Sequence, residues 1–273
     1  MRNALIAGTF TGAACGLVGW FLVLRAQVFA GEALSHVAFT GALAAAALGI
    51  DVRLGLFVAT IVVAVGMGGL GERAKADDVT IGTVFAWILG LGALCMAIFS
   101  RNGNGSDGAA AVHVLFGSIL GLSGTDTSLA VGISLAAIAA LLVLARPLLF
   151  SSLDPDVAAA QGVRVGALGL GFLVILGATA AEATQAVGAL LLLGLVAAPA
   201  AAAQRLARNP YRSLALAAVL AVAAVWGGLA FAYVVPRVPP STAIIVLAAS
   251  FYLAAAGMDS RPHGEPVGRA REA

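Results

Sequence analysis

The sequence predicts an all-α, polytopic membrane helix bundle with about eight to nine transmembrane helices. Hydrophobic residues make up 61% of its 273 residues and charged residues only 10%, whereas an ordinary soluble domain has about 25% charged residues. The mean hydropathy is +1.04, and the 34 glycines suit helices that pack closely in lipid. An open sheet could not satisfy its backbone hydrogen bonds in hydrocarbon, so helices are the expected structure.

Nine apolar runs are long enough to span a bilayer, which takes about 17 to 25 residues per helix. They cover approximately residues 4–24, 32–50, 54–71, 79–99, 127–145, 165–181, 185–203, 213–235 and 241–257. As one helix, 165–203 would be about 58 Å long, so it predicts a hairpin turning at its polar interruption, Glu182, Thr184 and Gln185. The run 112–122 is too short to span and is expected to re-enter the membrane or lie at its surface, with His113 as an interfacial residue without a catalytic part.

The distribution of basic residues predicts the orientation in the membrane. With the amino terminus outside, eleven basic residues fall on the inner side and four on the outer side, which the positive-inside rule favours. The inner set is Arg25, Arg73, Lys75, Arg146, Arg164, Arg205, Arg208, Arg212, Arg261, Arg269 and Arg271, and the outer set is Arg2, Arg53, Arg101 and Arg237. Residues 1–257 then form the transmembrane domain, and the polar residues 258–273 form a cytoplasmic tail that is predicted to be disordered. A net charge of only +2, scattered over loops, argues against nucleic acid as a partner.

Small residues in the first run predict tight helix packing. Gly8, Gly12 and Gly16 recur every four residues and share one helix face, which favours close packing within the monomer. Cys15 and Cys95 lie alone in separate apolar runs and are interpreted as small core residues.

The most informative stretch is GEALSHVAFTG, residues 31–41, which places Glu32 four residues before His36. At this spacing the carboxylate and the imidazole share a helix face. Together they offer oxygen and nitrogen to a divalent cation, a combination that suits zinc, manganese or ferrous iron. Both lie at the edge of an uncharged run, where ionisable groups are costly and usually functional. Alternatively, Glu32 caps the helix and His36 hydrogen-bonds a neighbouring helix.

A polar loop on the expected inner side, residues 151–163, predicts a short surface helix. Asp154 can cap it, Pro155 suits its first position, Asp156 suits its positive end, and Gly162 suits its stop. Lys75 is the only lysine and no GxxxxGK[ST] loop is present to bind phosphates. ATP-driven transport would therefore need an ATPase on another polypeptide. This short helix, which includes Ala159 and Gln161, is the expected contact site for that subunit. An ordinary loop helix is the alternative.

Glu182 and Gln185 lie at the expected outer turn of the hairpin. A carboxylate there could guide cations into a pore mouth. The alternative is a solvated turn without a transport role.

Five segments together resemble the membrane permeases of bacterial zinc, manganese and iron ABC importers, the zinc-uptake permease type. GEALSHVAFTG resembles that family's GDALSHAVLPG, DDVTIGTVFA resembles EDTAIGIVFA, and HVLFGSILGLS resembles YLFGNILAVS. LDPDVAAAQGV resembles FDPELARAQGL, and TQAVGALLLLGLVAAPAAAA resembles LQAVGVLLVLALLLIPAATA. The matches occur in order within about residues 24–257. Glu32 stands where the family has aspartate, and Thr40 where it has proline.

The resemblance implies a transport subunit of the bacterial plasma membrane that performs no bond chemistry itself. It implies that Glu32 and His36 contact transported Zn²⁺, Mn²⁺ or Fe²⁺, with no permanently bound cofactor. It also implies that residues 151–162 form the coupling helix that docks on the ATPase. The expected partners are a second permease copy in a homodimer, two ATPase subunits and an extracytoplasmic metal-binding protein.

Two other functions would also use ionisable residues in a membrane. A proton-coupled secondary transporter could use Glu32 and His36 as a relay, but the expected internal repeat with interrupted helices is not visible. An intramembrane metalloenzyme would need three protein ligands and a general base, and the three histidines, His36, His113 and His263, form no HExxH motif.

Overall fold

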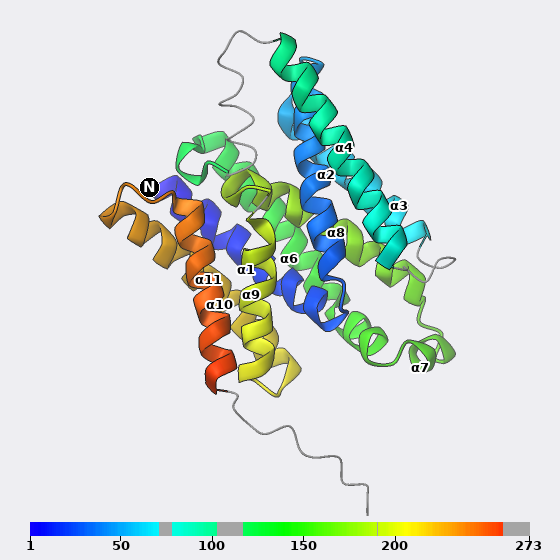
Figure 1. Ribbon diagram of the computed structural model, residues 1–273. Coiled ribbons are helices and arrows are strands. Elements are labelled where there is room, and N and C mark those ends of the chain that lie inside the picture. Colours follow the sequence, from blue (N-terminus) through cyan, green and yellow to red (C-terminus); the bar gives the residue numbers. More distant parts are fainter. Residues whose placement is uncertain (71–77, 103–116, 190, 259–273) are drawn as a thin grey trace, which may run out of the picture.

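The computed structural model describes residues 1–70, 78–102, 117–189 and 191–258, which form helices joined by turns (Figure 1). In chain order the elements are α1 (Arg2–Leu24), α2 (Val28–Ala47), α3 (Val52–Leu70), α4 (Asp78–Asn102), the 3₁₀ turn η1 (Ile119–Gly121), α6 (Gly124–Leu153), α7 (Pro155–Ala160), α8 (Val165–Val187), α9 (Leu192–Leu206), α10 (Pro210–Val234) and α11 (Pro240–Met258). His113 and the tail from 259 lie outside the described residues.

Within these ranges the helices match a multi-pass membrane protein. Seven of them are long and apolar enough to cross a membrane: α1, α2, α3, α6, α8, α10 and α11. Two more, α4 and α9, contain shorter apolar stretches, Phe85–Ile98 and Leu192–Leu206. This agrees with the expected eight to nine transmembrane helices.

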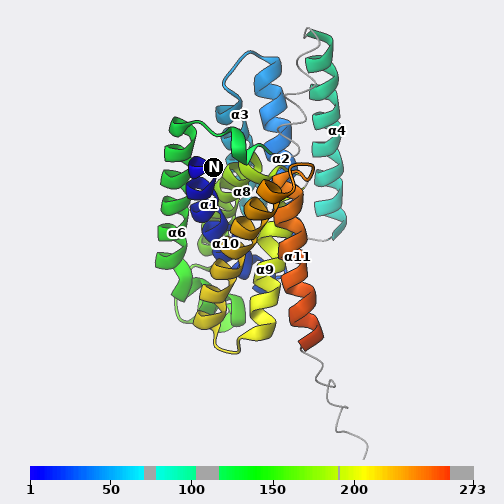
Figure 2. The same ribbon diagram turned by 90° about the vertical axis from the view of Figure 1, so that its left-hand side faces the viewer.

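The first helix, α1, runs through the middle of the bundle, between α6, α8, α9 and α10 (Figures 1 and 2). Its glycines allow neighbouring backbones to approach closely. A Cβ atom on Gly16 would lie 2.5 Å from the carbonyl oxygen of Ala217 in α10, and one on Gly19 would lie 1.9 Å from that of Val196 in α9. Gly8 and Gly12 face Val225 of α10, which confirms that the four-residue glycine repeat packs within the monomer.

The helices α2, α3 and α4 form a second group beside this bundle. α2 packs against α3 and α4, and α3 and α2 both contact α8. Gly41 and Gly55 bring α2 and α3 together, because a Cβ atom on either would lie 2.5 Å from the other's carbonyl oxygen. α4 packs chiefly on α2 and lies at the periphery in both views (Figures 1 and 2).

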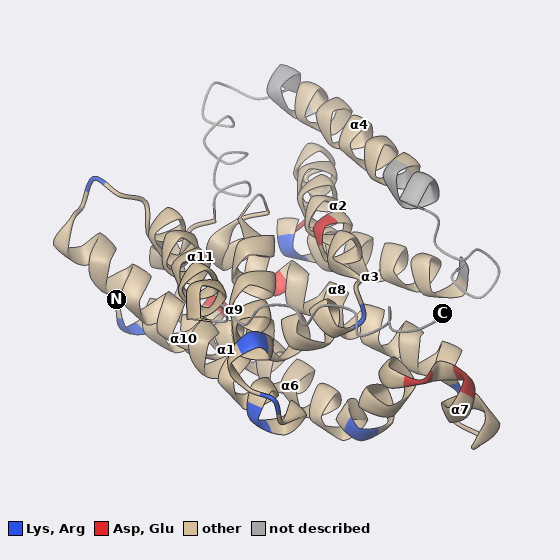
Figure 3. Cartoon of the chain, turned by 60° about the horizontal axis from the view of Figure 1, so that its bottom comes forward, with Lys and Arg blue, Asp and Glu red and all other residues tan. Residues whose placement is uncertain are grey.

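The short helix α7 marks one end of the molecule. The turn between α1 and α2 lies at the same end, because Arg25 donates a hydrogen bond to Ser152 just before α7. Figure 3 brings this end forward and shows basic segments spread over it, with acidic ones at α7. By the positive-inside rule it is the expected cytoplasmic end.

The hairpin between α8 and α9 turns later than predicted. α8 continues through Glu182, Thr184 and Gln185 to Val187, and the turn begins at Gly188, whose φ of +97° favours glycine. The predicted turn at 182–185 is therefore wrong. The helix continues because its polar groups find partners inside the protein: Thr184 bonds the carbonyl of Ala180, and Glu182 bonds Arg53.

Two further helix ends differ from the predicted runs. α2 begins at Val28 and not at residue 32. α6 starts at Gly124, where a capping box of Ser123 and Asp126 sets its beginning, and it continues to Leu153, well beyond the end of the apolar run 127–145.

Candidate functional site

Glu32 and His36 lie in the second and third turns of α2, near the end of the molecule that carries α7. α2 follows a tight turn at Arg25, Ala26 and Gln27, and its N-cap is Gln27. No acidic residue lies in its first turn, so Glu32 does not cap the helix. The capping alternative is therefore wrong.

The two side chains contact each other. Nε2 of His36 lies 3.2 Å from Oε1 of Glu32, and the side chains are 10% and 26% exposed. Two ligands bound to one transition-metal ion at about 2.0 to 2.2 Å would themselves lie roughly 3 to 3.4 Å apart. The observed separation therefore requires little rearrangement before an ion is held.

The second oxygen of Glu32 is the unusual feature of the pair. Oε2 is buried and has no hydrogen-bond partner among the described residues. Buried polar atoms in folded proteins are almost always paired, so an exception needs an explanation. A carboxylate oxygen held out of water beside an imidazole offers a cation one more ligand atom.

Helix α4 covers this face of α2. The ring of His36 packs edge-on against Phe85, with centroids 5.1 Å apart. One turn further along α2, Thr40 donates a hydrogen bond of 3.3 Å to the carbonyl of Ile88. The residue that replaces the family's proline thus ties α2 to α4.

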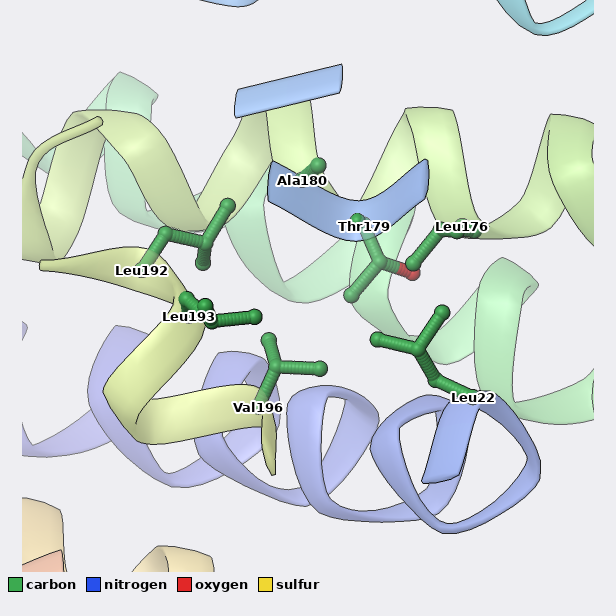
Figure 4. Close-up of a pocket in the computed structure, with 8 residues that line it drawn as sticks. Leu22, Leu176, Thr179, Ala180, Leu192, Leu193 and Val196 are labelled. Atoms are coloured by element: carbon green, nitrogen blue, oxygen red, sulfur yellow. The ribbon is translucent and has the colours of Figure 1, made fainter. Parts of the chain in front are cut away.

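No third ligand joins the pair in the part of the chain that the structure describes. Across the described ranges, no group of three or more His, Cys, Asp and Glu side chains is arranged to hold a metal ion. The small cavity in Figure 4 is no alternative, because its lining is apolar apart from Thr179, and that hydroxyl bonds the carbonyl of Ile175.

Glu182 is buried, at 3% exposure, and is not in a solvated turn. Nη2 of Arg53 donates to both of its oxygens, at 3.0 and 3.1 Å. Nη1 of Arg53 donates to Asp126 at 3.1 Å. The solvated-turn alternative is wrong. The pore-mouth role stays a prediction, and it requires Arg53 to move because both oxygens of Glu182 are occupied.

Gln185 lies one turn beyond Glu182 and is half-buried. Its Nε2 atom is buried and has no partner among the described residues. Its backbone carbonyl accepts a hydrogen bond of 3.1 Å from Ser118, so it also helps to hold the segment before η1 against α8.

The helix predicted at residues 151–162 is present as α7. The carboxylate of Asp154 accepts a hydrogen bond from the backbone of Val157 at 3.0 Å, and Pro155 and Asp156 lie in the first turn. Gln161 ends the helix and Gly162 follows with φ of +84°. Only Ala158 is buried, whereas Ala159 and Gln161 are exposed, so the helix presents most of its surface outward.

Two arginines were not predicted as part of any site. Arg53 was assigned to an outer loop and Arg25 to an inner one, yet both reach helices distant in sequence. The spacing Ser123 to Asp126 is a local capping-box signal for the start of α6, but it does not indicate the contact of Asp126 with Arg53. Nothing in the sequence around Arg25 points to Ser152.

Membrane-spanning helices that enclose an acid–histidine pair fit a membrane transport subunit, and not an enzyme. The chain belongs to the ABC 3 transport family, whose model matches residues 1–258. The resemblance to metal ABC transporter permeases is thereby confirmed, and with it a place as a multi-pass protein of the bacterial plasma membrane.

Individual relatives cover nearly the whole chain. The chain is 29% identical over 255 residues to the manganese transport system membrane protein MntC of Halalkalibacterium halodurans, covering 93% of this chain and 86% of that protein. It is 30% identical over 257 residues to the chelated iron transport system membrane protein YfeD of Yersinia pestis, covering 93% and 84%. Among solved structures, PsaBC from Streptococcus pneumoniae in complex with Fab matches with a TM-score of 0.81 and 27% identity, covering 93% of this chain and 90% of that one.

Proposed function

We propose that the protein is the membrane permease of an ATP-driven importer for divalent transition metal ions, namely zinc, manganese or iron. It would receive the ion from an extracytoplasmic binding protein and pass it to the cytoplasm. The observation that carries this proposal is the unpaired, buried oxygen of Glu32 beside His36. The names of the relatives, which refer to manganese and chelated iron, support a transition metal as the ion.

The composition of the pair fits transport better than storage. A ligand set along a pathway must replace the hydration water of the ion and yet release it. One carboxylate and one imidazole per protomer, completed by water or by a second protomer, bind less tightly than a closed site with four protein ligands.

The energy would come from another polypeptide. The sequence has no phosphate-binding loop, and α7 exposes most of its surface at the expected cytoplasmic end. We infer that α7 docks on an ATPase subunit, and that the working complex contains two permease copies and two ATPase copies.

Reconstitution tests the function. Vesicles containing the permease are given Mn²⁺ and the extracytoplasmic binding protein outside and ATP inside, with and without the ATPase subunits. Uptake is expected only with the ATPase. Concentrative uptake without it, driven by a proton gradient, would contradict the proposal and favour the secondary transporter.

The same vesicles test the ligand pair. In the complete complex, the double variant Glu32→Gln, His36→Ala should lower uptake by at least about 100-fold, since losing the ligands should cost no less than losing the groups that orient them. The matched control is Ser35→Ala, which removes a buried hydroxyl that donates to the carbonyl of Glu32 within the same helix. Wild-type uptake by the double variant would place the ion pathway elsewhere.

A further inference from the structure

Arg25 connects three parts of the molecule at the end that carries α7. Its Nη1 atom donates to Oγ of Ser152 near the end of α6, at 3.3 Å. Its Nε atom donates to the side chain of Gln27, the N-cap of α2, at 3.3 Å. Its guanidinium carbon lies 5.6 Å from the ring centroid of Phe172 in α8. One side chain therefore contacts α6, α8 and the start of α2.

The partners of Arg25 are suited to fixing its position and not to balancing its charge. The ion pairs in the described ranges are His36–Glu32, Arg53–Asp126 and Arg53–Glu182, and none involves Arg25. Partial burial lowers the pKa of Arg25 from its ordinary value, but a guanidinium group remains charged in proteins. Its planar guanidinium group instead contacts the hydroxyl of Ser152, the side-chain amide of Gln27 and the ring of Phe172. A lysine could not make all three contacts together.

These contacts lie between α7 and the helix that carries Glu32 and His36. Ser152 precedes Asp154 by two residues, and Asp154 both ends α6 and caps α7. α7 itself packs on the ends of α6 and α8, the two helices that Arg25 contacts. On the other side, Gln27 precedes Glu32 by five residues in a helix that otherwise packs mainly on α3, α4 and α8.

The turn that bears Arg25 is closed by backbone hydrogen bonds. The amide of Ala26 bonds the carbonyl of Val23 at 3.1 Å, and that of Gln27 bonds Leu22 at 3.0 Å. These two backbone hydrogen bonds make a tight turn between the end of α1 and the start of α2. A displacement of the guanidinium group is therefore passed to the first turn of α2 and is not absorbed by a loose loop.

We propose that Arg25 is a positioning residue that couples movement of α7 to the Glu32–His36 pair. This inference rests on the proposed function, in which an ATPase acts on α7. When the ATPase displaces α7, the junction of α6 and α7 moves with it, and Arg25 carries that movement to the start of α2. Coupling then travels through contiguous contacts among elements that move as rigid bodies.

The test measures metal transported per ATP hydrolysed, in vesicles containing the complete complex with its ATPase subunits and Mn²⁺ as the ion. Arg25→Met keeps an unbranched apolar side chain but removes the guanidinium group. It should lower the ratio of Mn²⁺ transported to ATP hydrolysed by about 2- to 30-fold, the range for substitutions along a coupling route. Mn²⁺ binding by the purified complex should stay at the wild-type level. Arg25→Lys should also lower the ratio, because charge alone does not reproduce the contacts.

The matched control is Arg208→Met, which removes an exposed arginine of the turn between α9 and α10. It should leave the ratio unchanged. Thermal unfolding of each variant separates coupling from folding, and Ser152→Ala provides a milder variant that should lower the ratio in the same direction. An unchanged ratio in Arg25→Met, with the wild type transporting normally, would overturn this inference and leave the proposed function intact. Failure of the wild type to transport any of Mn²⁺, Zn²⁺ and Fe²⁺ with ATP would instead overturn the proposed function.

Discussion

Glu32 and Glu182 are both carboxylates within membrane-spanning helices, but the protein neutralises them differently. Both oxygens of Glu182 accept hydrogen bonds from Arg53, and its side chain is 4% exposed. Glu32 has His36 at one oxygen and, in the part of the chain that is described, no partner at the other. Glu182 is thus paired with a permanent cation supplied by the protein, whereas Glu32 contacts an imidazole through one oxygen and has no partner at the other among the described residues.

Under the proposed function, this difference predicts a transport role for Glu32 and a structural role for Glu182. A buried carboxylate that is paired with a fixed guanidinium group holds helices together, here α3, α6 and α8 through Arg53. A carboxylate with a free oxygen is compensated fully only when a mobile cation arrives. The contrast predicts that substitutions at the two acids will affect different measurements.

The largest expected effect on stability is at Glu182. Glu182→Gln removes the buried one of the two charges that compensate Arg53, whose side chain is only 17% exposed, and leaves Asp126 as its partner. The free energy of unfolding should fall by about 1.5 to 3 kcal/mol. Chemical denaturation in detergent measures this change. Replacing both partners by methionine should recover most of the loss, because no unpaired charge is left buried.

The same denaturation experiment on Glu32→Gln completes the comparison. It should change the free energy of unfolding by less than about 1 kcal/mol, because the amide can still bond His36 and no fixed charge is left unpaired. Uptake should nevertheless stop. A loss of stability at Glu32 as large as at Glu182 would show that both acids are structural.

A smaller effect is expected when either acid is shortened. Glu32→Asp restores the family's usual residue and withdraws the carboxylate by about 1.5 Å, one carbon–carbon bond. It should keep transport and change the preference among zinc, manganese and iron by up to about tenfold, since selectivity depends on ligand geometry. Uptake of each ion in competition with the others measures it. Glu182→Asp is the control and should leave the preference unchanged.

The smallest effect concerns the turns next to the two acids. The turn after Glu182 has Gly188 at φ of +97°, whereas the turn before Glu32 has Ala26 at φ of +53°. A left-handed alanine costs energy that glycine avoids, so Ala26→Gly should raise the free energy of unfolding by about 0.5 to 1 kcal/mol. Ala30→Gly, within α2, should lower it by about 1 kcal/mol. A decrease in both variants would show that the turn carries no strain.

The features that sequence predicted correctly are local. Asp154, Pro155 and Gly162 specify α7 through contacts with their own neighbours, so a short window contains the whole signal. The spacing of Glu32 and His36 likewise places them on one helix face, and the contact at 3.2 Å follows.

The features that were missed depend on residues far apart in the chain. Glu182 and Gln185 predict a turn because these polar residues interrupt an apolar run. The partner that allows the helix to continue, Arg53, lies 129 residues away. Arg25 and Ser152 are separated by 127 residues. No pattern in a single sequence relates such positions. The contacts of Arg53 with Glu182 and of Arg25 with Ser152 are therefore seen only in the folded structure.

The central place of α1 has a consequence for how the protein is made. α1 is synthesised before α9 and α10, yet Val196 and Ala217, against which Gly19 and Gly16 pack, belong to those two later helices. During this interval lipid must surround its glycine faces. An apolar helix is stable in lipid on its own, so insertion and packing become separate stages. A chain truncated before α10 would keep the contacts of α1 with α6, α8 and α9 but leave its Gly8, Gly12 and Gly16 face uncovered.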